Sequence, residues 1–161
     1  MINEKQPFNL RCSILYCFQS YLYKNEQGQS QLIETLLPQQ ATIESQNSIT
    51  SGQLLIGGLF NTDPISNWLC ANVLSYAILD NKTQKEQLLR VQLTLNTQHQ
   101  SISLMQQCII LMQQYTQNFS NQNYQTIIAL LMLLSIWLVD NRPSVNQFLT
   151  LNNVPYVSLL K

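Results

Sequence analysis

Apolar side chains recur at three- and four-residue steps in three long stretches of the chain, which is the period of one helix face. Each stretch ends at an asparagine, in the sequences YLYKN, AILDN and WLVDN, so Asn25, Asn81 and Asn141 serve as reference positions. Apolar residues stand eleven, ten, seven, four and three positions before each asparagine, and seven and eight positions after it. The residues seven positions before are Phe18, Leu74 and Leu134. The pattern predicts one structural unit used three times.

The spacing of the units indicates the architecture. The reference asparagines are 56 and 60 residues apart, and self-similar helical segments of roughly this size are typical of α-solenoids. The helix lengths follow the three-helix cycle of armadillo-type repeats, with each asparagine ending the third helix. We therefore predict an all-α fold, an armadillo-like right-handed α-solenoid of about three repeats, with residues 1–161 as a single segment. Phe18, Leu74 and Leu134 are expected at equivalent core positions.

Capping signals predict where helices begin. Asp63 is a favoured N-cap residue, and Pro64 suits the first helical position, where no backbone donor is needed. Capping-box patterns also occur at Thr83 with Glu86 and at Ser144 with Gln147. These pairs predict that a helix starts at Thr83 and another at Ser144.

Breaks in the pattern bound the remaining elements. Helices are predicted over Phe8–Asn25, Ser30–Leu37, Thr50–Phe60, Thr83–Leu93, Ser103–Phe119 and Tyr124–Asp140. Gly28 is expected in the turn before the second of these, and Pro38 is expected to end it. Gly57 and Gly58 are expected to let a neighbouring helix approach closely. The structure is thus predicted to be almost wholly helical.

The ends of the chain lack polar capping repeats. Val154–Lys161 is predicted to begin a further helix, and the chain stops inside that apolar pattern. Because solenoids need polar repeats at both ends, we expect this chain to be a piece of a longer array.

Composition excludes several classes of function. Hydrophobic residues make up 45% of the 161 residues and charged residues only 10%, with a formal net charge of zero. The absence of a Lys and Arg cluster argues against nucleic-acid binding and against a polybasic membrane anchor. The longest apolar run, Ile127–Val139, is shorter than the roughly 20 residues that a membrane span needs. No signal peptide is visible at the N-terminus, so a cytosolic protein with four buried, reduced cysteines is expected.

The sequence offers no catalytic constellation. His99 is the single histidine, and its neighbours Gln98, Gln100 and Ser101 supply no acid to orient it. With one histidine and no CxxC pair, no metal-ligand spacing is present either. We therefore expect no enzyme activity, no metal and no cofactor.

Two groups of residues are candidates for binding other proteins. Trp68 and Asn72 match the Trp-xxx-Asn pattern with which nuclear-import receptors hold peptides in an armadillo groove, although packing is the simpler interpretation of Trp68. The second group is the densest cluster of charge in the chain, Lys82, Lys85, Glu86 and Arg90, next to Asp80. We expect its charged side chains to project into solvent, where a few charges on a neutral surface can steer a partner.

Three blocks of the chain carry a resemblance to a known family. Leu10–Pro38, Ser51–Leu93 and Leu130–Leu138, with the motifs LYCFQ, YLYKN, GQLL, GGLF, SNW and TQKEQLLRVQL, closely resemble the head of the golgin-like vesicle tethers of the vesicle docking protein family. The resemblance implies an armadillo-like head that is followed, outside this chain, by a coiled coil and an acidic tail. It implies no catalytic residues.

The resemblance also implies a function. Such tethers act in transport from the endoplasmic reticulum to the Golgi and within the Golgi, as cytoplasmic proteins that are peripheral on Golgi membranes and transport vesicles. The implied partners are a Rab-family GTPase, SNAREs and golgins, and full-length members form homodimers through the coiled coil. The alternative function is a groove of the nuclear-import receptor type that binds a basic peptide. That groove needs acidic residues on the long helices, where Asp63, Asp80 and Asp140 are the few available.

Overall fold

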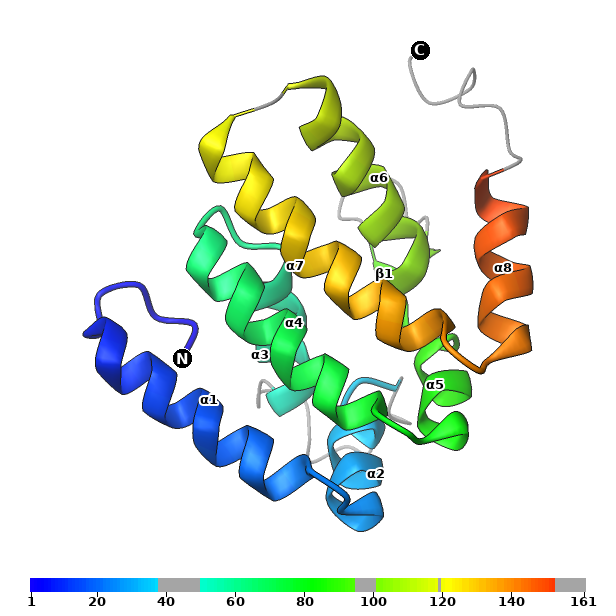
Figure 1. Ribbon diagram of the computed structural model, residues 1–161, viewed down its shortest axis with the longest axis horizontal. Helices are drawn as coiled ribbons and strands as arrows, with labels where there is room; N and C mark the ends of the chain where they lie inside the picture. Colours follow the sequence, from blue (N-terminus) through cyan, green and yellow to red (C-terminus); the bar gives the residue numbers. More distant parts are fainter. Residues whose placement is uncertain (38–49, 95–100, 119, 153–161) are drawn as a thin grey trace.

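A computed structural model describes residues 1–37, 50–94, 101–118 and 120–152 (Figure 1). The described residues form eight helices and one pair of short strands. The elements are α1 (Phe8–Leu22), α2 (Glu26–Glu34), α3 (Ser51–Leu59), α4 (Pro64–Ile78), α5 (Lys82–Leu88), β1 (Gln92–Thr94), β2 (Ser101–Ser103), α6 (Leu104–Gln117), α7 (Asn121–Leu138) and α8 (Arg142–Asn152). The prediction of an all-α fold is thus confirmed apart from the strand pair.

Three long helices, α1, α4 and α7, lie side by side in one layer with α4 in the middle (Figure 1). The shorter α2, α3 and α5 pack behind this layer, and α4 contacts α1, α2, α3, α5 and α7. Because neighbours cover most sides of α4, eleven of its residues are buried. The main core therefore runs through α4 and onto α7, where Trp137 is among the largest fully buried side chains.

The core positions predicted from the repeated pattern are occupied as expected in two units. Leu74 and Leu134 are buried, whereas Phe18 is only partly buried and packs against the edge of the core. Phe18 differs because α1 lies at the edge of the layer, with a long helix on one side only.

The three long helices end in the same way. Lys24, Asp80 and Asp140 each adopt a left-handed backbone conformation, with φ of 53°, 54° and 52°. The backbone amide of the asparagine that follows each of them donates a hydrogen bond to a carbonyl in the last turn of the long helix. In the second unit the Asn81 amide donates to the Ile78 carbonyl at 3.3 Å. Non-glycine residues adopt positive φ only where the surroundings favour it, so three occurrences at one position of the pattern indicate a shared junction. The prediction that the reference asparagines occupy equivalent helix ends is confirmed.

Each reference asparagine also begins the next helix, which the sequence prediction missed. The side chains of Asn25, Asn81 and Asn141 accept hydrogen bonds from the amides of Gly28, Gln84 and Ser144, at 3.1, 3.2 and 2.9 Å. The capping boxes predicted at Thr83 and Ser144 are therefore wrong, because an asparagine stands upstream of each and caps the helix earlier. The turn predicted around Gly28 is wrong for the same reason, since Gly28 lies inside α2.

Other predicted helix starts agree with the structure. The Asp63 side chain accepts from the amides of Ile65 and Ser66, and Pro64 occupies the first turn of α4. Of the adjacent pair Gly57 and Gly58 in α3, only Gly58 lies where a Cβ would collide with a neighbour, the Sγ atom of Cys70. A Cβ on Gly57 would meet open space, so the expected close approach holds for one glycine and not for the other.

The strand pair replaces the end of a predicted helix. The helix predicted to run to Leu93 ends at Leu88, and β1 pairs antiparallel with β2 through Leu93 opposite Ile102. A signal was present, because Val91 and Leu93 alternate with polar residues at the period of a strand. Residues 95–100 and 153–161, which include His99 and the helix predicted from Val154, lie outside the described residues.

A glutamine connects the first short helix to the end of the next long helix. Gln29, on α2, is buried and donates from Nε2 to the carbonyls of Tyr76 and Leu79, at 3.0 and 3.3 Å. Its Oε1 accepts from Nδ2 of Asn81 at 2.8 Å. Because the last carbonyls of a helix have no partner within that helix, the side chain satisfies groups that would otherwise be left unpaired.

We expect Trp137→Ala to lower the free energy of unfolding by about 3–5 kcal/mol, because the truncation leaves a large cavity next to α4 and α5. Trp68→Ala is the matched control, since Trp68 is 40% exposed. This variant should lose about 1 kcal/mol in free energy of unfolding. Urea denaturation at 25 °C measures both. Equal losses for the two variants would contradict the assignment of Trp137 to the core.

Candidate interaction surfaces

The charged residues of α5 form the first candidate surface. Lys82 and Glu86 are exposed and lie four residues apart on α5, so they share one side of the helix. Arg90 is exposed in the turn that follows its C-terminal end. The Arg90 guanidinium donates to Oε1 of Gln87 at 3.2 Å, which holds it near the helix. These three side chains are called the charged ridge below.

Lys85 does not belong to this surface, contrary to the prediction. Lys85 is only 3% exposed, and its Nζ donates a hydrogen bond to the carbonyl of Val139 at 2.7 Å. The indole Nε1 of Trp137 donates in return to the Lys85 carbonyl at 2.9 Å. The physical reason is that the last turn of α7 presents unpaired carbonyls at the negative end of the helix dipole, which attracts a cation. Lys85 therefore links α5 to α7.

The surroundings of Lys85 disfavour its charge. Burial lowers the pKa of the amine below its usual value, and the neighbouring Lys82 adds to this effect. The carboxylates of Asp140 and Asp80 oppose it and raise the pKa in part. A buried ammonium group with one carbonyl acceptor is a structural contact and does not steer a partner.

Trp68 and Asn72 lie on α4, in the layer of long helices. Trp68 is exposed, whereas Asn72 is buried and its Nδ2 donates to the carbonyl of Trp68 at 2.9 Å. The amide nitrogen is thus engaged within its own helix and is not presented to a peptide. In addition, α1, α4 and α7 contain no acidic residue. This geometry offers no support for a groove that binds a basic peptide.

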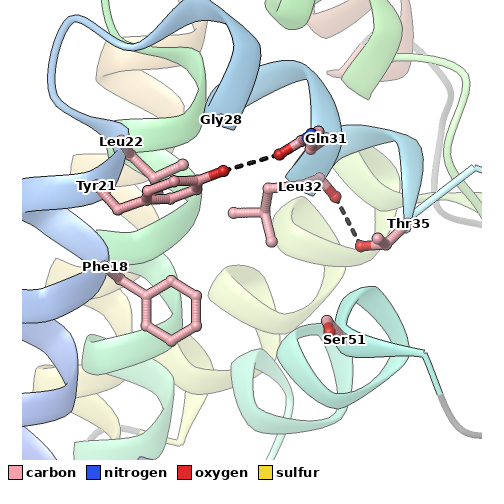
Figure 2. Close-up of a pocket in the computed structure, with 8 residues that line it drawn as sticks. All are labelled: Phe18, Tyr21, Leu22, Gly28, Gln31, Leu32, Thr35 and Ser51. Carbon is pink, nitrogen blue, oxygen red and sulfur yellow. Dashed lines mark hydrogen bonds between the residues drawn. The ribbon is translucent and has the colours of Figure 1, made fainter.

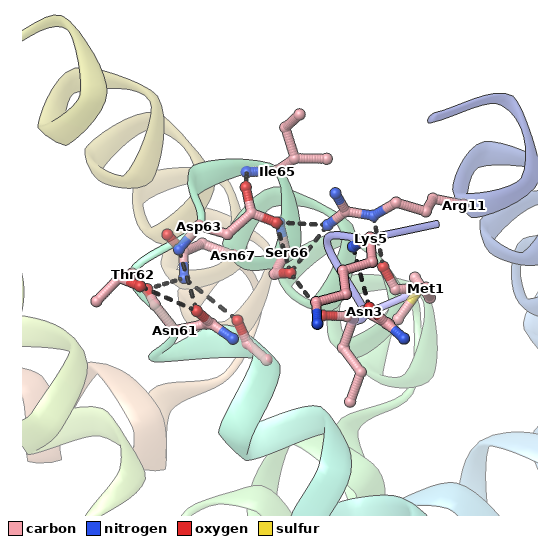
Figure 3. Close-up of polar contacts among 12 residues, drawn as sticks. Met1, Asn3, Lys5, Arg11, Asn61, Thr62, Asp63, Ile65, Ser66 and Asn67 are labelled. Carbon is pink, nitrogen blue, oxygen red and sulfur yellow. Dashed lines mark hydrogen bonds and ion pairs between the residues drawn. The ribbon is translucent and has the colours of Figure 1, made fainter. Parts of the chain in front are cut away.

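The strongest electrostatic cluster in the described part of the chain joins α1 to the start of α4 (Figure 3). Arg11 is 3% exposed and its Nη2 contacts Oδ2 of Asp63 at 2.6 Å and Oγ of Ser66 at 2.9 Å. Its Nε donates to the carbonyl of Met1 at 2.7 Å, which holds the N-terminal segment against these helices. Sequence reasoning identified Asp63 as an N-cap but missed its pairing with Arg11, because the two residues are 52 positions apart.

The cluster is a structural device. Burial by itself would raise the pKa of Asp63, but hydrogen bonds from Arg11, the Ser66 hydroxyl and two backbone amides outweigh it. The pKa of Asp63 therefore lies below its usual value, and the carboxylate stays ionised beside Arg11. All of its acceptor capacity is directed at the protein, so no group is available for chemistry on a substrate.

The cysteines and the acidic residues suggest no further chemistry. Burial raises the pKa of Cys70 and of Cys108 to about 12, which keeps both thiols protonated and unreactive. Cys17 is exposed and Cys12 is half-buried, so the expectation of four buried cysteines is wrong for these two. Among residues 1–37, 50–94, 101–118 and 120–152, no group of three His, Cys, Asp or Glu side chains is placed to hold a metal ion.

Comparison with known proteins identifies the family. The model of the head region of the Uso1/p115-like vesicle tethering proteins matches residues 1–157. This chain belongs to that family. The General vesicular transport factor p115 of human is 48% identical to it over 160 residues, and those of rat and mouse are 49% identical.

The match covers nearly the whole chain but a small part of its relatives. The alignment spans 98% of this chain and 16% of each of these p115 proteins, so the chain covers about a sixth of their length. In the part of this p115-like chain that the structure describes, no helix is both long and apolar enough to cross a membrane.

The ion pair predicts a specific pH dependence. A carboxyl group whose pKa is depressed by folding stabilises the fold above its unfolded-state pKa, near 3.8, and the contribution disappears as the pH falls through the lower folded-state value. Asp63→Asn keeps an N-cap but leaves Arg11 unpaired, so at pH 7 it should cost about 1.5–3 kcal/mol. Urea denaturation should show that the difference in free energy of unfolding between this variant and the wild type disappears below about pH 4. Asp80→Asn, at an exposed position, is the control, and a gap for Asp63→Asn that stays constant down to pH 2 would contradict the prediction.

Proposed function

We propose that this chain is a protein-binding segment of a vesicle tether that acts between the endoplasmic reticulum and the Golgi and within the Golgi. The observation that carries the proposal is the identity of 48–49%, over 98% of the chain, to proteins named as vesicular transport factors. The matched model describes the head region of vesicle tethering proteins, which supports the same function. A cytoplasmic protein that associates peripherally with Golgi membranes and vesicles through other proteins fits this role.

The segment is proposed to be part of an armadillo-like right-handed α-solenoid that includes all of residues 1–161. Support comes from the three equivalent junctions at Asn25, Asn81 and Asn141 and from the layer formed by α1, α4 and α7. A solenoid presents extended surfaces built from successive units, which suits a protein that binds several others.

The proposed partners are a Rab-family GTPase, SNAREs and golgins, and the full-length protein is proposed to be a homodimer. The charged ridge of Lys82, Glu86 and Arg90 is the proposed contact. Charged residues are only 10% of the chain, so three exposed charges on a short helix dominate the local field. Charges of this kind act mainly on the rate of association and on the choice of partner.

The ridge is tested by charge reversal in the full-length protein. Lys82→Glu with Arg90→Glu reverses both cations, and Lys85 is left unchanged because it is buried. We expect a folded protein whose association rate with at least one of the three partner classes falls about tenfold at low ionic strength. Surface plasmon resonance with each partner immobilised measures this rate.

The matched control carries the same change of charge elsewhere. Lys5 and Lys24 are exposed and lie outside α5, so Lys5→Glu with Lys24→Glu should bind as the wild type does. Unchanged rates for the ridge variant with every partner would show that the ridge serves solubility alone.

A further inference from the structure

A pocket opens where α1, α2 and α3 meet (Figure 2). It is lined by Phe18, Tyr21, Leu22, Gly28, Gln31, Leu32, Thr35 and Ser51. Its volume is about 190 Å³, below the roughly 300–1,000 Å³ of sites for small-molecule ligands and of the size of a single large side chain. Figure 2 shows the Phe18 ring and the Leu32 side chain directed into the space that Ser51 faces.

The next unit of the chain, from α4 to α6, repeats the order of a long helix, a short helix and a further helix, with the strand pair before the last. Seven of the pocket residues have counterparts 56 positions later, namely Leu74, Ala77, Ile78, Gln84, Gln87, Leu88 and Val91. The remaining helix, α3, corresponds to α6, because Thr50 and Ser103 are both N-caps that accept from the amide three residues later. Ser51 therefore corresponds to Leu104.

The first contacts of α3 and α6 support this correspondence. The Thr50 hydroxyl donates to the carbonyl of Thr35 at 3.2 Å, and the Leu104 amide donates to the carbonyl of Val91 at 3.1 Å. Thr35 and Val91 are themselves counterparts. Both helices thus begin against the same point of the preceding short helix.

The two units differ at six of the eight paired positions, and one pair of these differences is compensated. The first unit has Tyr21 and Gly28 where the second has Ala77 and Gln84. A Cβ on Gly28 would lie 2.8 Å from Cε1 of Tyr21, so the tyrosine ring occupies the room that the larger residue takes in the second unit.

A further difference lies at the first residue of α3 and α6. Leu104, the first residue of α6, is fully buried, as are Leu74 and Leu88, and all three belong to the same core cluster. Ser51 is exposed and too short to reach the same position. At this position the first unit thus has an exposed serine beside a pocket, where the second unit has a buried leucine.

We propose that this pocket is an anchor site that takes one leucine-sized apolar side chain from a protein partner. The bound side chain would occupy the position that Leu104 occupies in the second unit. Residues that dominate binding cluster in desolvated pockets, and an aliphatic side chain can serve as the anchor in such a pocket. That the partner is a protein rests on the proposed tethering function, whereas the preference for a leucine rests on the comparison of the two units.

The rim of the pocket indicates the chemistry that surrounds the anchor. The Tyr21 hydroxyl donates to Oε1 of Gln31 at 2.8 Å, and the Thr35 hydroxyl donates to the carbonyl of Leu32 at 2.7 Å. The lining contains no charged side chain. The partner segment is therefore expected to present its leucine between uncharged residues.

The pocket is first tested on its own with a small probe. N-acetyl-leucine amide is titrated into the chain while the methyl resonances of Leu22 and Leu32 are followed by NMR. We expect saturable shifts with a dissociation constant on the order of millimolar, and no saturation with N-acetyl-glutamine amide. Absence of saturable shifts with the leucine probe overturns the proposal.

Ser51→Leu supplies the missing side chain from within. This variant should remain folded and bind the probe at least tenfold more weakly, because the introduced side chain would fill the pocket. Ser20→Leu is the matched control, since Ser20 is exposed on α1 and does not line the pocket, and it should bind as the wild type does. Equal binding by Ser51→Leu and wild type overturns the proposal.

The protein partner is tested in the full-length molecule. Ser51→Leu should lower the affinity for the GTPase, the SNAREs or a golgin at least tenfold, and unchanged affinity for all three overturns the assignment to a protein partner. Failure of the proposed tethering function appears separately, as a wild-type protein that binds none of the three. The charged ridge lies on α5 and not beside this pocket, so the two sets of variants report on different surfaces.

Discussion

The arrangement of helices depends on the junction at which each long helix ends and the next short helix begins. A left-handed residue turns the chain, and the asparagine that follows caps the new helix with its side chain. Because the same geometry occurs after α1, α4 and α7, each short helix leaves its long helix in the same manner. That direction brings α2 against α4 and places α5 within reach of α7.

The fourth residue after the asparagine then connects one unit to the next. Gln29 donates to the last carbonyls of α4 and accepts from Asn81, so it satisfies both groups. Lys85 occupies the corresponding position on α5 and donates to the last turn of α7, but an ammonium group has no acceptor. Consistent with this, Nδ2 of Asn141 is buried without a hydrogen-bond partner. The contact of Lys85 with the end of α7 therefore satisfies fewer polar groups than the contact of Gln29 with the end of α4.

The sequence predicted the parts of the fold that depend on local periodicity and failed where distant contacts decide. Helix faces, the Asp63 cap and the equivalent asparagines follow from neighbours along the chain. The burial of Lys85 does not, because the carbonyl that receives it is 54 positions away. The Arg11 partner of Asp63 was missed for the same reason, since it is 52 positions away. The pairing of β1 with β2 is local and was missed although the alternation of Val91 and Leu93 with polar residues indicated a strand. The pocket beside Ser51 could have been found by comparing the two units position by position, since a serine there replaces a leucine.

The central claim is that the side chain at this fourth position joins the units through the end of the following long helix. The most direct measurement is the free energy of unfolding of Lys85→Gln beside Lys85→Ala, by urea denaturation at pH 7. A glutamine can donate to Val139 and accept from Asn141, as Gln29 does in the first unit, without burying a charge. The account predicts that Lys85→Gln is at least as stable as the wild type, while Lys85→Ala loses about 1–3 kcal/mol. A Lys85→Gln variant that loses as much stability as Lys85→Ala would contradict it.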